Sequence, residues 1–581
     1  MQREYDAVIV GAGGAGLYAA LEASGSGRVA VISKLFPVRS HTGTAQGGIG
    51  AALGNLEEDK PEWHAFDTIK GGDYLVDQGA AALLAEEAIQ AVYDLENMGL
   101  PFSRTPDGRI DQRRFGGHTR NFGEAPVRRA CYAADRTGHM ILQTLYQQCI
   151  KNEVDFYNEY FAVDLILDGP ACKGLVVLEL ASGELHTIRA KAVMLATGGF
   201  GRMFKTTSNA YANTGDGPAL VLRRGVPLED MEFYQFHPTG IAGMGILITE
   251  AVRGEGGILR NRQGEAFMAK YAPKLLDLAP RDMISKAILS ELKAGNGMRG
   301  DRQIDDYVLL DATTLGKEVV EEKIPDIADF CRTYLGIDPV TQPIPVQPTA
   351  HYGMGGIPTD TDGRVLRGEG EDRYLGLYAA GECACVSVHG ANRLGTNSLV
   401  DLVVFGRRAG RHIADYIERT DLGRAPDGSD AYSRDKIARL KSGKGVHGGA
   451  IREEMQKTMM EEVGVIREGA AMRRAIAKIE ELRDRYREAR VQDGGSAFNT
   501  DLLELLELEN LLDLSLVTAE AALRREESRG GHTREDFPER DDGKWLKHSL
   551  ARLADGHPSG RVEFEYKGVD TSLYPPKPRV Y

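Results

Sequence analysis

A glycine-rich segment close to the N-terminus has the spacing of a turn that binds a dinucleotide. The pattern G-x-G-x-x-G is filled by Gly11, Ala12, Gly13, Gly14, Ala15 and Gly16. In such a turn the first glycine permits a tight bend, the second lets a pyrophosphate approach, and the third lets the helix pack on the strand. The N-terminus of that helix then faces the anion. The alternative is a strand-to-helix turn that merely needs glycine.

Two further glycine segments favour FAD over a nicotinamide cofactor. Thr197 and Gly198 follow an apolar run, and Glu382 follows a second run that ends in glycine. Three such segments suit FAD, which is a long ligand and needs contacts at several strand ends. The second predicted strand ends at Ser33 and Lys34, where no acidic residue accepts ribose hydroxyls. Glu382 is therefore either an acceptor for ribose or ribityl hydroxyls or a carboxylate that stabilises a helix N-terminus.

The elements that must position these segments begin as a β-α-β unit. Residues 7–10 and 29–32 are short apolar runs typical of buried strands, and residues 17–23 between them have helical spacing. Residues 192–196 and 375–380 predict further strands of the same sheet. We therefore expect an α/β fold, with a doubly wound FAD-binding domain and an inserted α+β capping domain, followed by a helical domain and a C-terminal tail.

Changes in residue usage divide the chain into five expected parts. Residues 236–345 combine histidine, proline and glycine with charged helical patterns. From about residue 416 the chain is rich in charged helical patterns, and residues 546–581 end in a proline-rich segment. The expected parts are 1–235 and 346–415 for FAD binding, 236–345 for the cap and substrate, 416–545 for the helices and 546–581 for the tail.

Composition limits the classes of function. The chain has 581 residues, of which 42% are hydrophobic and 27% charged, as in an ordinary soluble globular protein. Its net charge of −14 argues against nucleic acid as a partner, because no basic field neutralises phosphates. We find no apolar run long enough to span a membrane and no secretory signal. The six cysteines include no C-x-x-C pair, so we expect no iron–sulfur or structural zinc site in this chain.

Six further segments resemble a known family. They are residues 39–48 (RSHTGTAQGG), 237–240 (HPTG), 249–257 (TEAVRGEGG), 280–282 (PRD), 351–356 (HYGMGG) and 389–399 (HGANRLGTNSL). In order and spacing, these segments resemble the flavoprotein subunits of succinate dehydrogenases and fumarate reductases over nearly the whole chain. Any one of them could arise by chance, but the set is highly specific. The resemblance implies FAD as the cofactor and succinate and fumarate as the substrate and product.

The resemblance also implies how the cofactor is held. In the family a histidine at this place bonds to the flavin 8α carbon, so His41 is the expected point of covalent attachment. Gln46 favours a dehydrogenase, because many fumarate reductases have glutamate there. Besides the N-terminal turn, the other expected cofactor contacts are Ser33, Lys34, Ser40, Thr42, Gly47, Gly48, Ala162, Thr197, Gly198, Asp216, Glu382, Asn397, Ser398 and Leu399.

Four residues of these segments are the expected substrate ligands. His237, Thr249, His351 and Arg393 match family positions and lie in glycine-rich segments. A buried dicarboxylate needs cationic and hydrogen-bonding partners at both ends, or its desolvation would be prohibitive. The planar guanidinium of Arg393 suits a carboxylate.

Proton transfer is assigned by resemblance to Arg281, with Glu250 and Arg253 as a relay. The assignment is chemically awkward, because arginine ordinarily keeps its proton. Two alternatives stay open. In the first, Arg281 is only an electrostatic clamp. In the second, Glu250 and Arg253, which are three residues apart, form an ordinary helical ion pair.

Electrons taken from succinate must leave the flavin one at a time. Because the chain has no metal motif to receive them, we expect an iron–sulfur subunit as a partner. Membrane-anchor subunits carrying a quinone site are expected beyond it, which would place this chain at the cytoplasmic face of the cell membrane.

Four functions remain in competition. The first is the flavoprotein subunit of a succinate:quinone oxidoreductase, and the second is a quinol-linked fumarate reductase that runs in the opposite direction. The third is L-aspartate oxidase, a relative without the covalent histidine, and His41 argues against it. The fourth is a catalytically idle flavoprotein kept as an assembly scaffold, which the complete set of substrate residues argues against. We expect the first.

Overall fold

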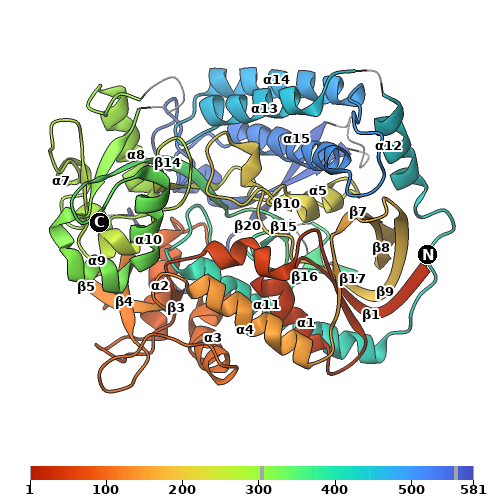
Figure 1. The fold of residues 1–581 in the computed structure, drawn as a ribbon, viewed down its shortest axis with the longest axis horizontal. Helices are drawn as coiled ribbons and strands as arrows, with labels where there is room; N and C mark the ends of the chain where they lie inside the picture. The colour runs from red at the N-terminus through yellow and green to blue at the C-terminus, as the bar shows by residue number, and fades with distance from the viewer. Residues whose placement is uncertain are drawn as a thin grey trace.

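A mixed eight-stranded sheet, called the central sheet because it lies between two hydrophobic cores, stands on the right in Figure 1. The computed structural model describes residues 2–300, 306–368, 370, 372–443, 445–554 and 561–579. The strands of the central sheet are β1 (Gln2–Val10), β2 (Val29–Ser33), β6 (Asp155–Asn158), β7 (Tyr160–Asp168), β8 (Ala171–Glu179), β9 (Leu185–Leu195), β16 (Arg364–Leu366) and β17 (Arg373–Ala379). β1 pairs in parallel with β2 and β9, so that Val10 lies beside Ile32 and Leu195. The ends of these three strands therefore meet at one edge, where α/β sheets bind ligands.

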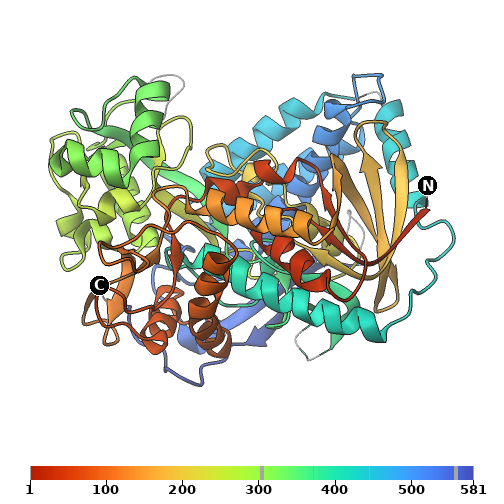
Figure 2. The same cartoon turned by 60° about the horizontal axis from the view of Figure 1, so that its bottom comes forward.

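Successive side chains of residues 7–10 in β1 point to opposite faces of the sheet, and both sets are apolar and buried. Ala7 and Ile9 belong to one hydrophobic core, and Val8 and Val10 belong to another. The first core is covered by α1 (Gly14–Ala23), α3 (Gln78–Asn97), α4 (Thr137–Lys151) and α11 (Asn397–Arg419). Figure 2 shows α1, α4 and α11 side by side on this face. The expected doubly wound α/β fold is confirmed.

Glycines bring α1 and α11 into backbone contact. A Cβ atom on Gly406 would lie 2.7 Å from the carbonyl oxygen of Ala15, and one on Gly410 would lie 2.7 Å from the Cα of Ala19. Larger side chains would push these helices apart. The close approach holds the start of α11 against the N-terminal glycine turn, although the two segments are almost 400 residues apart.

A second sheet with short helices forms a separate layer at one end of the molecule, on the left of Figure 1. Its antiparallel strands are β11 (Tyr234–Ile241), β14 (Ile344–Gly353), β13 (Val308–Asp311) and β12 (Ile258–Arg260). Its helices are α6 (Ala251–Gly254), α7 (Met268–Tyr271), α8 (Arg281–Lys293), α9 (Lys317–Lys323) and α10 (Pro325–Phe330). These elements share their own hydrophobic core. They occupy the region expected as the inserted cap, and β14 continues past residue 345.

The C-terminal helices share a core with the central sheet. They are α12 (Ala431–Ser442), α13 (Gly448–Glu462), α14 (Gly469–Arg487) and α15 (Thr500–Arg524). Leu514 and Val517 of α15 lie in the same core as Val8 and Val10. The segment expected as a tail also contains β19 (Lys547–Leu553) and β20 (Val562–Gly568), which form a sheet with β10 (Leu228–Glu229).

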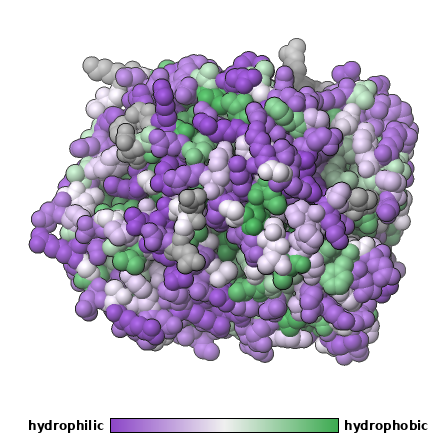
Figure 3. Space-filling view, turned by 180° about the vertical axis from the view of Figure 1, so that it is seen from behind, coloured by the Kyte–Doolittle hydropathy of each residue, from purple (hydrophilic) through white to green (hydrophobic). Residues whose placement is uncertain are grey.

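The remaining elements connect these layers. They are α2 (Pro61–Gly71), α5 (Asp216–Leu222), α16 (Asp542–Trp545), β3 (Ile49–Gly50), β4 (Gln112–Arg120), β5 (Ala125–Cys131), β15 (Ile357–Pro358) and β18 (Ala384–Cys385). Among the residues described, no helix is both long and apolar enough to cross a membrane. The face shown in Figure 3 is mainly hydrophilic, with small scattered hydrophobic groups.

Candidate active site

A cavity of about 720 Å³ opens where the ends of β1, β2, β9 and β17 meet. This volume lies within the usual range for sites that bind small molecules and cofactors. Most of the expected cofactor contacts line it, namely Gly11, Ala12, Gly13, Gly14, Ala15, Ser33, Lys34, Ser40, His41, Thr42, Gln46, Ala162, Thr197, Gly198, Asp216, Glu382, Ser398 and Leu399. Segments from positions 11 to 399 therefore converge on one cavity.

Four expected cofactor contacts are not in the cavity lining, namely Gly16, Gly47, Gly48 and Asn397. Gly16 packs against the turn instead, because a Cβ there would lie 2.0 Å from the carbonyl oxygen of Gly11. The Asn397 amide bonds His64 Nε2 at 2.9 Å and donates to Thr68 at 2.9 Å, so it fixes the start of α11.

The N-terminal turn leaves its backbone open to a ligand. Gly11 has a φ of +112°, and a Cβ there would lie 2.1 Å from the carbonyl oxygen of Ala196. Only glycine fits this position. The amide of Gly14 donates to Thr42 Oγ1 at 3.1 Å, so the segment with His41 closes over the turn. This backbone cradle fits the pyrophosphate of FAD.

An ion-pair network lies at the end of the cavity beside β2. Lys34 Nζ is 2.8 Å from Asp216 and 2.7 Å from Glu507. Asp216 also accepts hydrogen bonds from Thr214 at 2.8 Å and Asn510 at 2.9 Å. Lys34 therefore pairs with two acidic side chains, Asp216 and Glu507, of which Asp216 also lines the cavity. Glu507 and Asn510 come from α15, and sequence reasoning did not find them.

His41 lies on the cavity wall, in a single turn of 3-10 helix (His41–Thr44). Its Nδ1 accepts a hydrogen bond from the backbone amide of Ala210 at 3.3 Å, and Thr44 Oγ1 is 3.1 Å from the same atom. Because Nδ1 accepts this hydrogen bond, Nε2 is the nitrogen that carries the hydrogen of the neutral ring. Burial lowers the pKa of His41 to about 4, so the imidazole is neutral at pH 7.

Arg281 is the first residue of α8 and reaches a buried carboxylate. Its Nε donates to Glu250 Oε2 at 2.7 Å. Arg253 Nη2 lies 3.7 Å from the same oxygen, so Glu250 stands between the two arginines. Burial alone would raise the pKa of Glu250, but Arg281 and Arg253 outweigh it and lower that pKa. Glu250 is thus a carboxylate at neutral pH.

Arg393 lies on the other side of the site and is held by Gln235. Its Nη2 donates to Gln235 Oε1 at 3.2 Å, and its Nη1 donates to the carbonyl oxygen of Leu394 at 3.2 Å. The guanidinium lies 4.4 Å from the centre of the Tyr352 ring. Burial, and then the charge of Arg281, lower the pKa of Arg393 to about 9. Sequence reasoning missed Gln235, although it stands only two positions before His237 in the matched strand.

The two expected substrate histidines meet edge to face, with ring centroids 5.1 Å apart. His237 Nδ1 accepts from the backbone amide of Thr239 at 3.2 Å, so its Nε2 carries a hydrogen. Nε2 is buried without a hydrogen-bond partner among the described residues. His351 bonds Ser208 Oγ through Nδ1 at 2.7 Å and lines the cofactor cavity.

Burial and the charge of Arg281 hold the pKa of both His237 and His351 well below the ordinary value. These histidines are therefore neutral hydrogen-bonding groups at pH 7. Arg253, Arg281, Arg393 and the carboxylate of Glu250 are all buried here, and these four side chains together carry a net charge of +2. A dicarboxylate carries the matching charge of −2, so the site suits such a ligand electrostatically.

Thr249 is buried beside this region, and its hydroxyl accepts from the amide of Ala251 at 3.2 Å. Asp282, next to Arg281, pairs with Arg579 near the end of the chain. Arg579 also donates to the carbonyl oxygen of Gly71 at 3.0 Å. The C-terminal segment therefore joins α8 of the cap to α2, a contact that sequence reasoning did not find.

Comparison with known proteins agrees with this arrangement. Residues 6–399 match the family model described as FAD binding domain, and residues 452–581 match that described as fumarate reductase flavoprotein C-term. The succinate dehydrogenase flavoprotein subunit of Coxiella burnetii is 50% identical, over 99% of both chains. The mitochondrial one of Oryza sativa is 46% identical, over 100% of this chain and 94% of the relative.

Solved structures give the same result. An E. coli quinol fumarate reductase superposes with a TM-score of 0.94 and 39% identity, over 100% of this chain and 99% of the other. Mycobacterium smegmatis Sdh1 in complex with UQ1 superposes with a TM-score of 0.86 and 38% identity, over 99% and 96%. The chain belongs to the family of succinate dehydrogenase and fumarate reductase flavoprotein subunits.

Proposed function

We propose that this chain is the flavoprotein subunit of a succinate:quinone oxidoreductase and oxidises succinate to fumarate. The observation that carries the proposal is the buried region of net charge +2 beside the cofactor cavity. Two of its donors that have no hydrogen-bond partner among the described residues, His237 Nε2 and Arg393 Nε, suit the carboxylates of a dianion. The names of the relatives, most of which are succinate dehydrogenases, support the direction of the reaction.

The protein's own residues would bind and orient the substrate. Arg393, His237 and His351 hold the two carboxylates, and the buried position keeps water away from the reacting carbons. When bound, FAD supplies the two-electron oxidation by accepting the hydride that leaves one methylene carbon. The proton that leaves the neighbouring carbon must go to a group of this chain.

We assign that proton to Arg281. A guanidinium is a poor base, but Arg281 is hydrogen-bonded to the Glu250 carboxylate at 2.7 Å. Glu250 is in turn 3.7 Å from Arg253, which offers a route Arg281–Glu250–Arg253. On this route Arg281 needs to lose its proton only transiently. The competing clamp role predicts that Arg281 affects binding and turnover equally.

Covalent attachment of FAD at His41 is part of the proposal. The neutral imidazole lines the cavity, and its Nδ1 accepts a hydrogen bond, so Nε2 carries the ring hydrogen and would give it up as a proton when it forms the bond. Gln46 also lines the cavity and fits a dehydrogenase. The quinol-linked fumarate reductase is the second candidate, and the likeness to the E. coli quinol fumarate reductase favours it.

Partners complete the proposed function. The structural relatives are named as quinol fumarate reductase and as Sdh1 in complex with UQ1, which supports passage of electrons to a quinone. We propose an iron–sulfur subunit as the first acceptor and membrane-anchor subunits with the quinone site. The chain would then lie at the cytoplasmic face of the cell membrane, held there by these partners.

The test is purification of the chain with its partners, followed by two rates on one preparation. We expect the reduction of quinone by succinate to be faster than the oxidation of quinol by fumarate. The reverse order would favour the fumarate reductase. A preparation that contains FAD and the partners yet catalyses neither reaction would reject the proposal.

A further inference from the structure

We propose that Gln235 is a positioning residue that holds Arg281 and Arg393 at a fixed separation without adding negative charge. The inference rests on the proposed function in one respect, since it concerns the site for a dianionic substrate. Gln235 is buried in β11, and its Oε1 accepts from Arg281 Nη1 at 3.0 Å and from Arg393 Nη2 at 3.2 Å. One carbonyl oxygen thus bridges two guanidiniums that come from different layers of the fold.

The orientation of the Gln235 amide is fixed by its other end. Nε2 donates to Asn392 Oδ1 at 2.9 Å and to the carbonyl oxygen of Arg393 at 2.8 Å. Both acceptors would repel an oxygen, so Oε1 must face the arginines. Asn392 in turn donates to the carbonyl oxygen of Gly71 at 3.2 Å, which ties the loop to α2.

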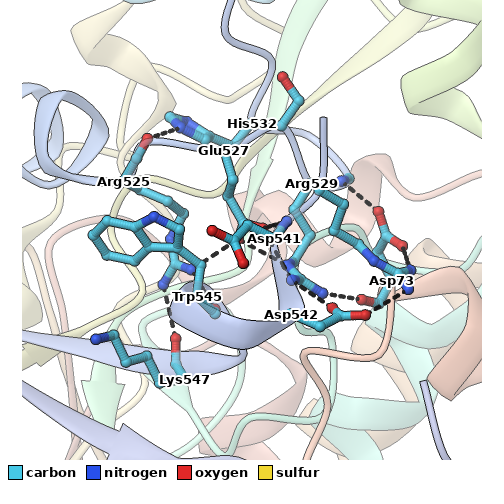
Figure 4. Close-up of polar contacts among 12 residues, drawn as sticks. Asp73, Arg525, Glu527, Arg529, His532, Asp541, Asp542, Trp545 and Lys547 are labelled. Carbon is cyan, nitrogen blue, oxygen red and sulfur yellow. Dashed lines mark hydrogen bonds and ion pairs between the residues drawn. The ribbon is translucent and has the colours of Figure 1, made fainter. Parts of the chain in front are cut away.

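The loop that carries Arg393 is supported from the C-terminal part of the chain, where Arg525, Glu527 and Arg529 form the ion-pair network drawn in Figure 4. The amide of Gly531 donates to the carbonyl oxygen of Ala391 at 2.8 Å. The preceding residues are anchored through Asp73, which accepts from the Gly530 amide at 2.9 Å and whose carbonyl oxygen accepts from Arg529 at 2.9 Å.

A buried ion-pair network keeps this support rigid. Glu527 pairs with Arg525 at 3.1 Å and with Arg529 at 2.8 Å, and Arg525 pairs with Glu232 at 2.6 Å. Glu232 lies just before β11, so one network fixes both the loop with Arg393 and the strand with Gln235. The bridge therefore joins two segments that are already held in place.

An amide is the group that this position requires. The positive charge of Arg281 disfavours the charged form of Arg393, so the two guanidiniums repel each other in a dry site. A glutamate would relieve the repulsion, but it would also lower the net charge from +2 to +1. The amide dipole offers an acceptor to both arginines and keeps the charge that the dianion needs.

The test compares Gln235→Glu with Gln235→Met, which has a similar size and no acceptor. Malonate and malonamate binding would be measured by calorimetry on the purified holoenzyme, because malonamate replaces one carboxylate by an amide. For Gln235→Glu we expect malonate affinity to fall by about tenfold or more, with a smaller loss for malonamate. For Gln235→Met both affinities should fall by a similar factor, because the charge is unchanged and only the bridge is lost.

Gln347→Glu is the matched control. Gln347 is a buried amide on the neighbouring strand β14, and its side chain has no hydrogen bond to either arginine among the described contacts. The control should keep malonate affinity within about twofold of wild type.

Equal losses of malonate and malonamate in Gln235→Glu would overturn the charge argument, and wild-type affinity in Gln235→Met would overturn the bridge. The Met variant decides the bridge even if the Glu variant does not fold. Failure of the proposed function can be distinguished from failure of the bridge, because wild-type protein would then bind malonate but would not oxidise succinate.

Discussion

Replacing Arg393 by lysine should reveal how dry the substrate site is. Burial, and then Arg281, lower the pKa of Arg393 from its ordinary 12.5 to about 9. The same surroundings would lower the pKa of a lysine at this position below its ordinary value of about 10.4. Arg393→Lys would therefore lose its charge at a lower pH than an exposed lysine does. It would also lose the hydrogen bonds to Gln235 and Leu394, because an ammonium lacks the planar fork of a guanidinium.

Two effects on malonate affinity follow. At pH 6 the loss of charged hydrogen bonds should cost about 2 to 4 kcal/mol. As the pH rises above 6, the ratio of variant to wild-type dissociation constants should increase, because the lysine loses its proton at a lower pH than an exposed lysine would. The assay is malonate titration of the holoenzyme by flavin absorbance at several pH values. A ratio that does not change with pH would refute the argument from desolvation, and unchanged affinity at every pH would remove Arg393 from the site.

Three further predictions test other parts of the site. Arg281→Lys and Glu250→Gln should each lower the turnover of flavinylated enzyme by about 10²- to 10⁴-fold, while malonate affinity changes by less than about tenfold. If turnover and malonate affinity fall together, Arg281 is a clamp. Acid-denatured wild-type protein should keep yellow, fluorescent flavin. His41→Ser should bind FAD without covalent attachment and lose succinate oxidation more than fumarate reduction. Flavin that washes off the assembled wild-type enzyme would contradict covalent attachment. Burial would lower the pKa of His548, but Asp230 raises it to about 10, so its stabilising effect is complete below pH 6.5 and is lost as pH rises through 10. The free energy of unfolding should then fall by up to about 1.4 kcal/mol per pH unit in this window, and urea melts of His548→Gln should lack that slope.

Local signals in the sequence predicted which segments meet at one cavity, whereas their contacts with FAD remain a prediction. The glycine turn, the strand-end glycines and the segment with His41 each need particular residue types at fixed spacing, and the fold brings most of them to one cavity. The α/β fold class was predictable for the same reason, since the continuous apolar run of residues 7–10 predicts a strand buried on both faces, and its side chains enter two hydrophobic cores in the structure. The roles of the substrate residues remain proposals, although the structure places Arg281, Glu250 and Arg393 in one hydrogen-bonded group with Gln235.

Contacts between distant segments were not predictable from periodicity. Glu507 reaches Lys34 across 473 positions, and nothing local in either segment indicates the other. The helix α15 is buried nearly all round, and its acidic residues resemble a solvated face in the sequence. In the structure these charges are paired, as Glu509 is with Lys436 and Asp513 with Arg223 at 2.9 Å. Burial of paired charges allowed the expected helical domain to join the central core.

The position of Gln235 shows why the site and its support have to be considered together. A site of net charge +2 repels itself until a dianion enters, and free protein must resist that repulsion with neutral groups. Gln235 does so without cancelling the charge, because its Oε1 accepts from both guanidiniums while its Nε2 is fixed by the backbone carbonyl oxygen of Arg393. The supporting ion pairs around Glu527 stand farther back, where their negative charges serve the fold. Charge needed for binding is thereby separated from charge needed for stability, and a residue such as Gln235, which joins the two regions, should tolerate change less well than its uncharged side chain suggests.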